Sequence, residues 1–144
     1  MTITSTEITP AIWRSSLRHL KAVDPHLGRV IDACGNIQLE IQRRRSPFEY
    51  LLRSIIFQQL SGKAAATIHG RFLDLFPLKR PTPERVLKLK PQKFRSVGVS
   101  GNKERAIRDL ARHARDGQVP GFATLSRMSD EEIIDTFTAI HGIG

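Results

Sequence analysis

Apolar residues recur every three to four positions along most of this chain, which is the spacing of one buried face of an α-helix. The longest such stripe runs from 48 to 60 and predicts a helix at the centre of the core. Similar stripes cover 64–75, 106–114 and 133–140. The strongest stripe consists of Phe48, Leu51, Leu52, Ile55, Ile56 and Leu60. The pattern as a whole predicts an all-α fold.

Capping signals mark the starts of several predicted helices. Ser46-Pro47-Phe48-Glu49 and Ser129-Asp130-Glu131-Glu132 each place a serine three residues before a glutamate, which is the arrangement of a capping box. Thr9-Pro10 and Asp24-Pro25 each place a cap residue before a proline at the first helical position. Because these signals follow one another closely, we expect the linkers between helices to be short.

The first third of the chain departs from the helical pattern at one place. Residues 37–41 alternate between apolar and polar side chains, which predicts a short extended segment with one buried face. The run Arg43-Arg44-Arg45 follows, and it is either a solvated turn or a phosphate contact. We therefore divide the chain into N-terminal helices with a short extended segment, 1–45, and a main helical domain, 46–144.

Charge and cysteine content narrow the class of protein. The 23 lysines and arginines outnumber the 14 acidic residues, and the net charge of +9 favours a nucleic-acid partner over a chain that is simply basic. The single cysteine, Cys34, excludes an internal disulfide framework, and we interpret it as a small buried residue. No apolar run reaches membrane-spanning length and no export signal is present. We expect a soluble, cytoplasmic, nucleoid-associated bacterial monomer without a membrane partner or a cofactor.

Three local features interrupt the helical background. Gln58 and Gln59 end the strongest apolar stripe, where they either read a base edge or simply terminate a helix. The segment 98–103 approaches a helix with Gly98, Ser100 and Lys103, which suits a phosphate or an ordinary helix cap. The last residues, 140–144, read Ile-His-Gly-Ile-Gly directly after a capped amphipathic helix. Two glycines around one apolar residue make a tight turn whose exposed N–H groups suit an anion.

Together these features resemble the 3-methyladenine (alkylpurine) DNA glycosylases of the helix-hairpin-helix superfamily. The resemblance runs in order from about residue 46 to the end, and more loosely from Trp13. The Gln-Gln-Leu-Ser block separates this branch from the endonuclease III and adenine-mismatch branches. The motifs that carry the resemblance are Gln58-Gln59-Leu60-Ser61, Lys63-Ala64-Ala65, Gly98-Val99-Ser100, Lys103, Leu125-Ser126, Ser129-Asp130-Glu131-Glu132 and Ile140-His141-Gly142-Ile143-Gly144.

The resemblance implies a role for each motif. Gln59 and Leu60 would be the wedge that enters the gap left by a flipped nucleotide, with Gln58 and Ser61 beside the base pocket. The turn His141-Gly142-Ile143-Gly144 would bind a phosphate through its N–H groups, with a monovalent cation at His141 and Ile143. The DNA-binding residues implied in full are Gln58, Gln59, Leu60, Ser61, Lys63, Gly98, Ser100, Lys103, His141, Gly142, Ile143 and Gly144.

The implied reaction is hydrolysis of the N-glycosidic bond of alkylated purines, such as 3-methyladenine, in double-stranded DNA during base excision repair. In the family the catalytic aspartate lies beyond the hairpin, so it would fall after Gly144. The resemblance therefore implies a C-terminally truncated, inactive glycosylase, and it assigns no aspartate of this chain to catalysis. The alternative is a non-enzymatic helix-hairpin-helix module that only grips DNA backbone. The resemblance also predicts that Gln58–Leu60, 98–103 and 141–144 lie on one surface, because all three would touch one stretch of DNA.

Overall fold

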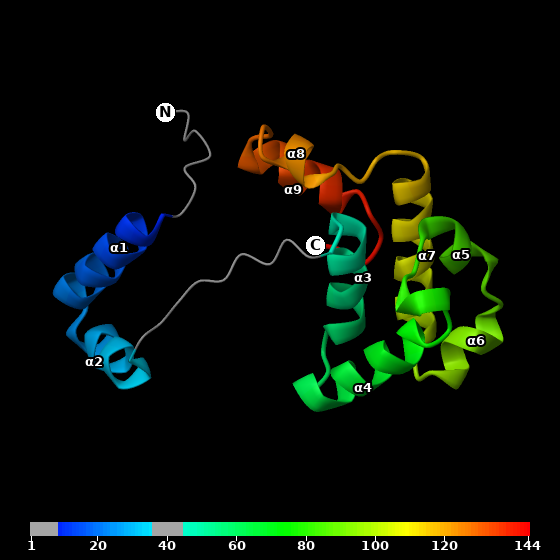
Figure 1. The fold of residues 1–144 in the computed structure, drawn as a ribbon, viewed down its shortest axis with the longest axis horizontal. Coiled ribbons are helices and arrows are strands. Elements are labelled where there is room, and N and C mark those ends of the chain that lie inside the picture. Colours follow the sequence, from blue (N-terminus) through cyan, green and yellow to red (C-terminus); the bar gives the residue numbers. More distant parts are fainter. Residues whose placement is uncertain (1–8, 36–44) are drawn as a thin grey trace. The chain divides into compact units, whose positions relative to one another are not determined.

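The structure, a computed structural model, describes residues 9–35 and 45–144 of the chain. It forms two compact units, Met1–Arg43 and Arg44–Gly144, each of which is described by itself. All regular elements of the described residues are helical, as Figure 1 shows, so the predicted all-α fold is confirmed. The predicted extended segment 37–41 and the first two arginines of the 43–45 run lie outside the described residues.

The first unit contains helices α1 (Pro10–Val23) and α2 (Pro25–Cys34). Both starts follow the predicted caps, because the Thr9 hydroxyl accepts the Ile12 N–H and the Asp24 carboxylate accepts two N–H groups of the next turn. Cys34 is exposed, which corrects its interpretation as a buried residue. It occupies the last position of α2, immediately before a glycine in a left-handed conformation, rather than a position inside the helix pair.

The second unit is built around a long helix, and Figure 1 shows its arrangement. That helix, α7 (Gly101–Arg115), packs against α3 (Pro47–Phe57) and α5 (Pro83–Lys88), and α4 (Gly62–Leu73) packs against α3. No helix of the described residues has the length and apolar character needed to cross a bilayer. The elements of this unit are α3 (Pro47–Phe57), α4 (Gly62–Leu73), the 3₁₀ helix η1 (Pro77–Lys79), α5 (Pro83–Lys88), α6 (Pro91–Ser96), α7 (Gly101–Arg115), α8 (Phe122–Leu125) and α9 (Asp130–Thr138).

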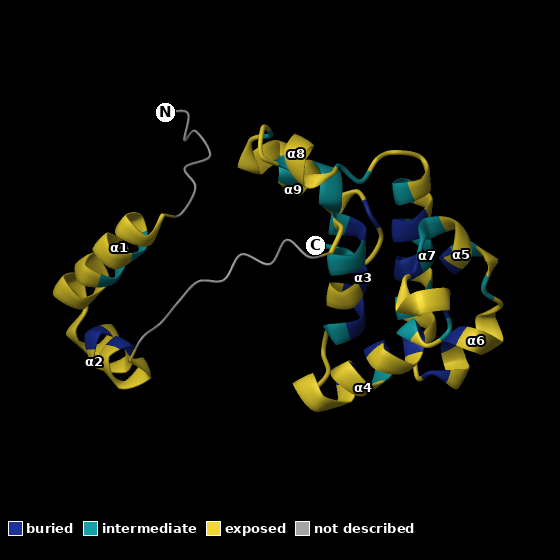
Figure 2. Cartoon of the chain, in the orientation of Figure 1, coloured by how far each residue is buried: buried dark blue, intermediate teal, exposed yellow. Residues whose placement is uncertain are grey.

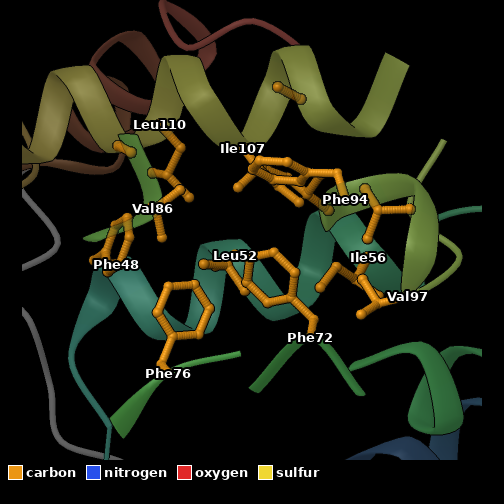
Figure 3. Packing of buried hydrophobic residues seen from close by; sticks show 14 of the residues in the cluster. Phe48, Leu52, Ile56, Phe72, Phe76, Val86, Phe94, Val97, Ile107 and Leu110 are labelled. Atoms are coloured by element: carbon orange, nitrogen blue, oxygen red, sulfur yellow. The ribbon is translucent and has the colours of Figure 1, made fainter. Parts of the chain in front are cut away.

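The core of this unit lies between α3, α4 and α7; Figure 2 colours the chain by burial, and Figure 3 shows the packed side chains. Leu52, Ile55 and Ile56 of α3 are completely buried, as the apolar stripe predicts. The ring of Phe72 on α4 lies 5.7 Å from that of Phe94 on α6. Each such side chain contributes about 1.5–3 kcal/mol through burial. This core holds α7 rigidly against the end of α3.

The capping boxes are confirmed at both predicted helix starts. In α3 the Ser46 hydroxyl accepts the Glu49 N–H, and the Glu49 carboxylate accepts the Ser46 N–H at 2.8 Å. In α9 the same pair of bonds joins Ser129 and Glu132. A cap of this kind contributes about 1 kcal/mol. These two boxes fix the starts of α3 and α9. Helix α3 leads to residues 58–61, and α9 leads to residues 140–144.

Two apolar stripes end differently from the sequence prediction. Helix α3 ends at Phe57, three residues before Leu60, and the Leu60 side chain is 39% exposed instead of completing the buried face. In the 133–140 stripe, Ile140 is buried although it lies beyond the end of α9 at Thr138, whereas Ile134 on α9 remains 58% exposed. Periodicity alone cannot detect the end of α3, because Leu60 also falls at helical spacing from Ile56.

Candidate nucleic-acid interface

The chain turns sharply between α3 and α4, and we call residues 58–61 the glutamine corner. Gln58 leaves helical geometry with φ −54° and ψ 132°, and Gln59 takes a left-handed conformation with φ 54°. The Ser61 hydroxyl then caps α4 by accepting the Ala64 N–H. A left-handed glutamine costs energy, and residues in such conformations cluster at binding and active sites. The corner thus presents Gln59 and Leu60 at the end of a rigid helix.

Lys103 on α7 contacts the end of α3, where the glutamine corner begins. Its ammonium donates to the carbonyl oxygens of Ile56 at 2.7 Å and of Gln58 at 2.9 Å. These carbonyls stand at the C-terminus of α3, where a cation is favourable to the helix dipole. Burial lowers the pKa of the Lys103 ammonium. In this structure its contacts are therefore with backbone carbonyls, whereas the sequence predicted a phosphate contact.

The terminal turn, residues 140–144, lies against α7. The Ile143 N–H donates to the Ile140 carbonyl at 3.1 Å, and the His141 N–H donates to the Asp109 carboxylate at 2.9 Å. Gly142 has φ 84°, and a Cβ at this position would lie 2.7 Å from the Cβ of Ala106. Only a glycine meets both requirements, the left-handed backbone and the close approach to α7.

A direct hydrogen bond joins the glutamine corner to the terminal turn. The Gln58 side-chain amide donates to the Gly142 carbonyl at 2.9 Å, although the two residues are 84 positions apart in sequence. Two hollows open on this surface, of about 360 and 470 Å³. Their combined lining is Gln58, Gln59, Ser100, Asn102, Lys103, Arg105, Ala106, His141, Gly142, Ile143 and Gly144. We call this set the corner–turn surface.

The structure gathers most, but not all, of the residues predicted to bind DNA. Gln58, Gln59, Ser100, Lys103 and 141–144 line the two hollows, which places three distant segments of the sequence on one surface.

The remaining four predicted residues do not line these hollows. Leu60 and Lys63 are exposed at the corner and at the start of α4, while Ser61 caps α4. Gly98 has a packing reason of its own, because a Cβ there would lie 3.2 Å from the Ile68 side chain.

The terminal turn offers fewer free N–H groups than the sequence predicted. The N–H groups of His141 and Ile143 are occupied by Asp109 and by the turn itself. The N–H groups of Gly142 and Gly144 donate to no group of the described residues, so these two are available to an anion. The predicted set of four donors is thus reduced to two.

The monovalent cation expected at His141 and Ile143 would need free backbone oxygens in the same turn. The carbonyls of His141 and Ile143 accept no hydrogen bond from any described residue, and carbonyl oxygens are suitable ligands for a hard cation. Within the part of the chain that the structure describes, no group of three or more His, Cys, Asp or Glu side chains is placed to hold a metal ion.

Sequence reasoning missed three residues of this region. Asn102 and Arg105 line the smaller hollow beside Ser100 and contact each other, and the Asp109 carboxylate accepts the His141 N–H of the turn. Arg105 and Asn102 follow Ser100 within the first turns of the same helix, so their spacing was visible in the sequence. Asp109 gave no such signal, because its partner His141 is 32 positions away.

Known DNA repair proteins match the part of the chain that contains the glutamine corner and most of the terminal turn. The family model of the HhH-GPD superfamily base excision DNA repair proteins matches residues 52–142, from α3 to the terminal turn. DNA-3-methyladenine glycosylase 1 of Schizosaccharomyces pombe is 30% identical over 140 residues, covering 96% of this chain and 61% of that protein. The alkylbase DNA glycosidase-like protein mag2 of the same organism is 25% identical over 137 residues, covering 91% of this chain and 62% of that protein.

Solved structures show the same relationship in three dimensions. The S. pombe 3-methyladenine DNA glycosylase Mag1, in complex with abasic DNA, superposes with a TM-score of 0.84 at 30% identity, covering 90% of this chain and 64% of that one. A DNA-3-methyladenine glycosidase from Bacillus halodurans gives a TM-score of 0.71 at 34% identity, covering 87% and 56%. This chain therefore spans about 60% of the length of these relatives. The matched region includes the glutamine corner and the terminal turn as far as Gly142, and the chain belongs to the HhH-GPD superfamily of base excision DNA repair proteins.

Proposed function

We propose that this chain forms the DNA-gripping part of a monofunctional glycosylase that removes alkylated purines, such as 3-methyladenine, from double-stranded DNA. One observation carries the proposal: the hydrogen bond from Gln58 to the Gly142 carbonyl joins the glutamine corner to the terminal turn, the segments that would meet the minor groove and a phosphate. The names of the similar proteins support the substrate class. A surface of this kind meets one short stretch of duplex at two points.

The grip on DNA comes from backbone donors and positive charge. The free N–H groups of Gly142 and Gly144 suit one phosphate, and the exposed cations Lys63 and Arg105 suit its neighbours. The net charge of +9 adds long-range attraction to any duplex. Such contacts contain no sequence information, so binding should be sequence-independent and should weaken steeply as salt rises.

The wedge is formed by Gln59 and Leu60. Leu60 is an apolar side chain held 39% exposed at the tip of a corner, directly after the left-handed Gln59. Apolar side chains of this kind enter base steps from the minor groove and occupy the space that a flipped base leaves. A duplex that already lacks the base avoids the cost of unstacking it, so this surface should favour abasic DNA over intact DNA.

The wedge can be tested by comparing a duplex containing a stable abasic-site analogue with an intact duplex of the same sequence, using fluorescence anisotropy. We expect the chain to prefer the abasic duplex by about tenfold, equivalent to 1.4 kcal/mol. Leu60→Ala should remove the preference but keep binding to intact DNA. Leu78→Ala is the matched control, because Leu78 is also an exposed leucine but lies on η1. Equal preference in the Leu60 variant and the wild type would contradict the wedge assignment.

Catalysis requires a carboxylate that faces the sugar and stabilises the oxocarbenium-like state. Among the described residues no acid lines either hollow, and Asp109 is occupied by the His141 N–H and by Arg112. We therefore expect residues 1–144 to bind methylated duplex DNA without releasing free base. Chromatography of the incubation mixture would measure base release. Turnover that is abolished by Asp135→Asn would show that a carboxylate of this chain performs the reaction.

A further inference from the structure

Helix α7 contacts both halves of the corner–turn surface through positions spaced three residues apart. The Lys103 ammonium donates to the carbonyls of Ile56 and Gln58, and the Asp109 carboxylate accepts the His141 N–H. Between them, the Ala106 side chain lies so close to Gly142 that a Cβ there would be 2.7 Å from the Ala106 Cβ. The spacing winds these contacts along one side of the helix. One rigid element therefore determines how far the glutamine corner stands from the terminal turn.

We propose that Lys103 and Asp109 are positioning residues, which hold the glutamine corner and the terminal turn at the separation that one stretch of DNA backbone requires. The proposal rests on the proposed function, because it assigns to α7 the geometry of that same DNA-binding surface. Neither side chain contacts DNA in this account. Each acts on backbone groups of the segments that do.

The surroundings of Lys103 support a role in positioning rather than in phosphate binding. An ammonium has three N–H donors, and two of them are already directed at the end of α3. Moving this side chain to a phosphate would leave the Ile56 and Gln58 carbonyls without their partner. Burial also penalises the charged group, as its lowered pKa shows, and the two carbonyls offset that penalty.

The surroundings of Asp109 support the same conclusion. A carboxylate beside a phosphate-binding turn repels the phosphate. A structural role for Asp109, rather than a contact with DNA, explains why it lies there. Its second oxygen contacts Arg112 at 3.0 Å, which offsets part of its charge, and the imidazole of His113 lies 3.6 Å away. Because the His141 N–H is occupied, the N–H groups of Gly142 and Gly144 remain the donors of the turn that have no partner among the described residues.

Amide hydrogen exchange in the DNA-free chain tests the positioning role directly. We expect Asp109→Ala to accelerate exchange of the His141 amide by about tenfold or more, since a hydrogen bond to a charged acceptor is lost. Asp109→Asn, which keeps an acceptor oxygen, should restore most of the protection. Asp116→Ala is the matched control, because Asp116 is also paired with an arginine but caps the far end of α7. Unchanged exchange in Asp109→Ala would overturn the proposal.

The salt dependence of DNA binding separates positioning from phosphate contact at Lys103. Removing a phosphate-binding lysine lowers the slope of log K against log salt by about 1. We expect that reduction for Lys63→Met, whereas Lys103→Met should weaken binding about tenfold at every salt concentration and leave the slope unchanged.

Two outcomes of these measurements distinguish the proposal from the function on which it rests. A slope reduced by about 1 in Lys103→Met would identify a phosphate ligand and overturn the assignment of Lys103. A wild-type chain that binds no duplex DNA would contradict the proposed function, and the exchange measurement would then decide the positioning of the terminal turn on its own.

Discussion

Gly142 shows how one residue can be constrained twice. Its φ of 84° belongs to the left-handed region, and the Cβ of any other residue would lie 2.7 Å from Ala106. The sequence indicated the first requirement, because a Gly-Ile-Gly turn needs a permissive backbone. It did not indicate the second, since Ala106 lies on a helix that precedes the turn by more than thirty residues.

Gly142→Ala should therefore destabilise the chain by about 1–3 kcal/mol, because the left-handed backbone and the close contact both oppose a methyl group. Thermal unfolding followed by circular dichroism measures the effect. The double variant Ala106→Gly/Gly142→Ala should recover the part that is due to the contact. Gly70→Ala is a suitable control, since Gly70 lies in α4 with open space around its Cβ position and should gain stability. Equal melting temperatures for Gly142→Ala and the wild type would refute this reading.

At the scale of elements, helix starts were more predictable than helix ends. Ser46 and Ser129 predicted the starts of α3 and α9, because a capping box joins residues that are only three positions apart in the sequence. The end of α3 carries no comparable signal, because Gln58 and Gln59 are both acceptable helix formers and Leu60 keeps the apolar spacing. The four-residue helix α8, at 122–125, is too short to show a period at all.

The contacts that join elements were the least predictable. The sequence indicated that the glutamine corner, the 98–103 segment and the terminal turn share a surface, and the structure brings them together. It assigned Lys103 to a phosphate, because a lysine in the first turn of a helix suits one. In the structure its ammonium donates to the carbonyls of α3, and the salt dependence of DNA binding decides between the two roles. A side chain's partner depends on the packing of α7 against α3, which local spacing does not contain.

At the scale of the whole molecule, the chain combines a strong positive charge with one rigid corner–turn surface. Residues 52–142 match the HhH-GPD superfamily, and the described part of the second unit contains a continuous core from α3 to the terminal turn. The core sets the orientation of α7, and α7 in turn sets the separation of the glutamine corner and the terminal turn, the two segments that we propose face DNA. The central claim is that both segments meet the same stretch of duplex.

A nitroxide spin label on the DNA phosphate beside an abasic-site analogue tests that claim most directly. Amide signals of the chain bound to this duplex would be compared with those of a complex whose label has been reduced. The account predicts that residues 58–61 and 141–144 broaden together, while α5 (Pro83–Lys88), whose Leu87 carbonyl meets α7 at Arg108 rather than at a position that contacts the turn, keeps its signals. Broadening of only one of the two segments, or of α5 in their place, would contradict it.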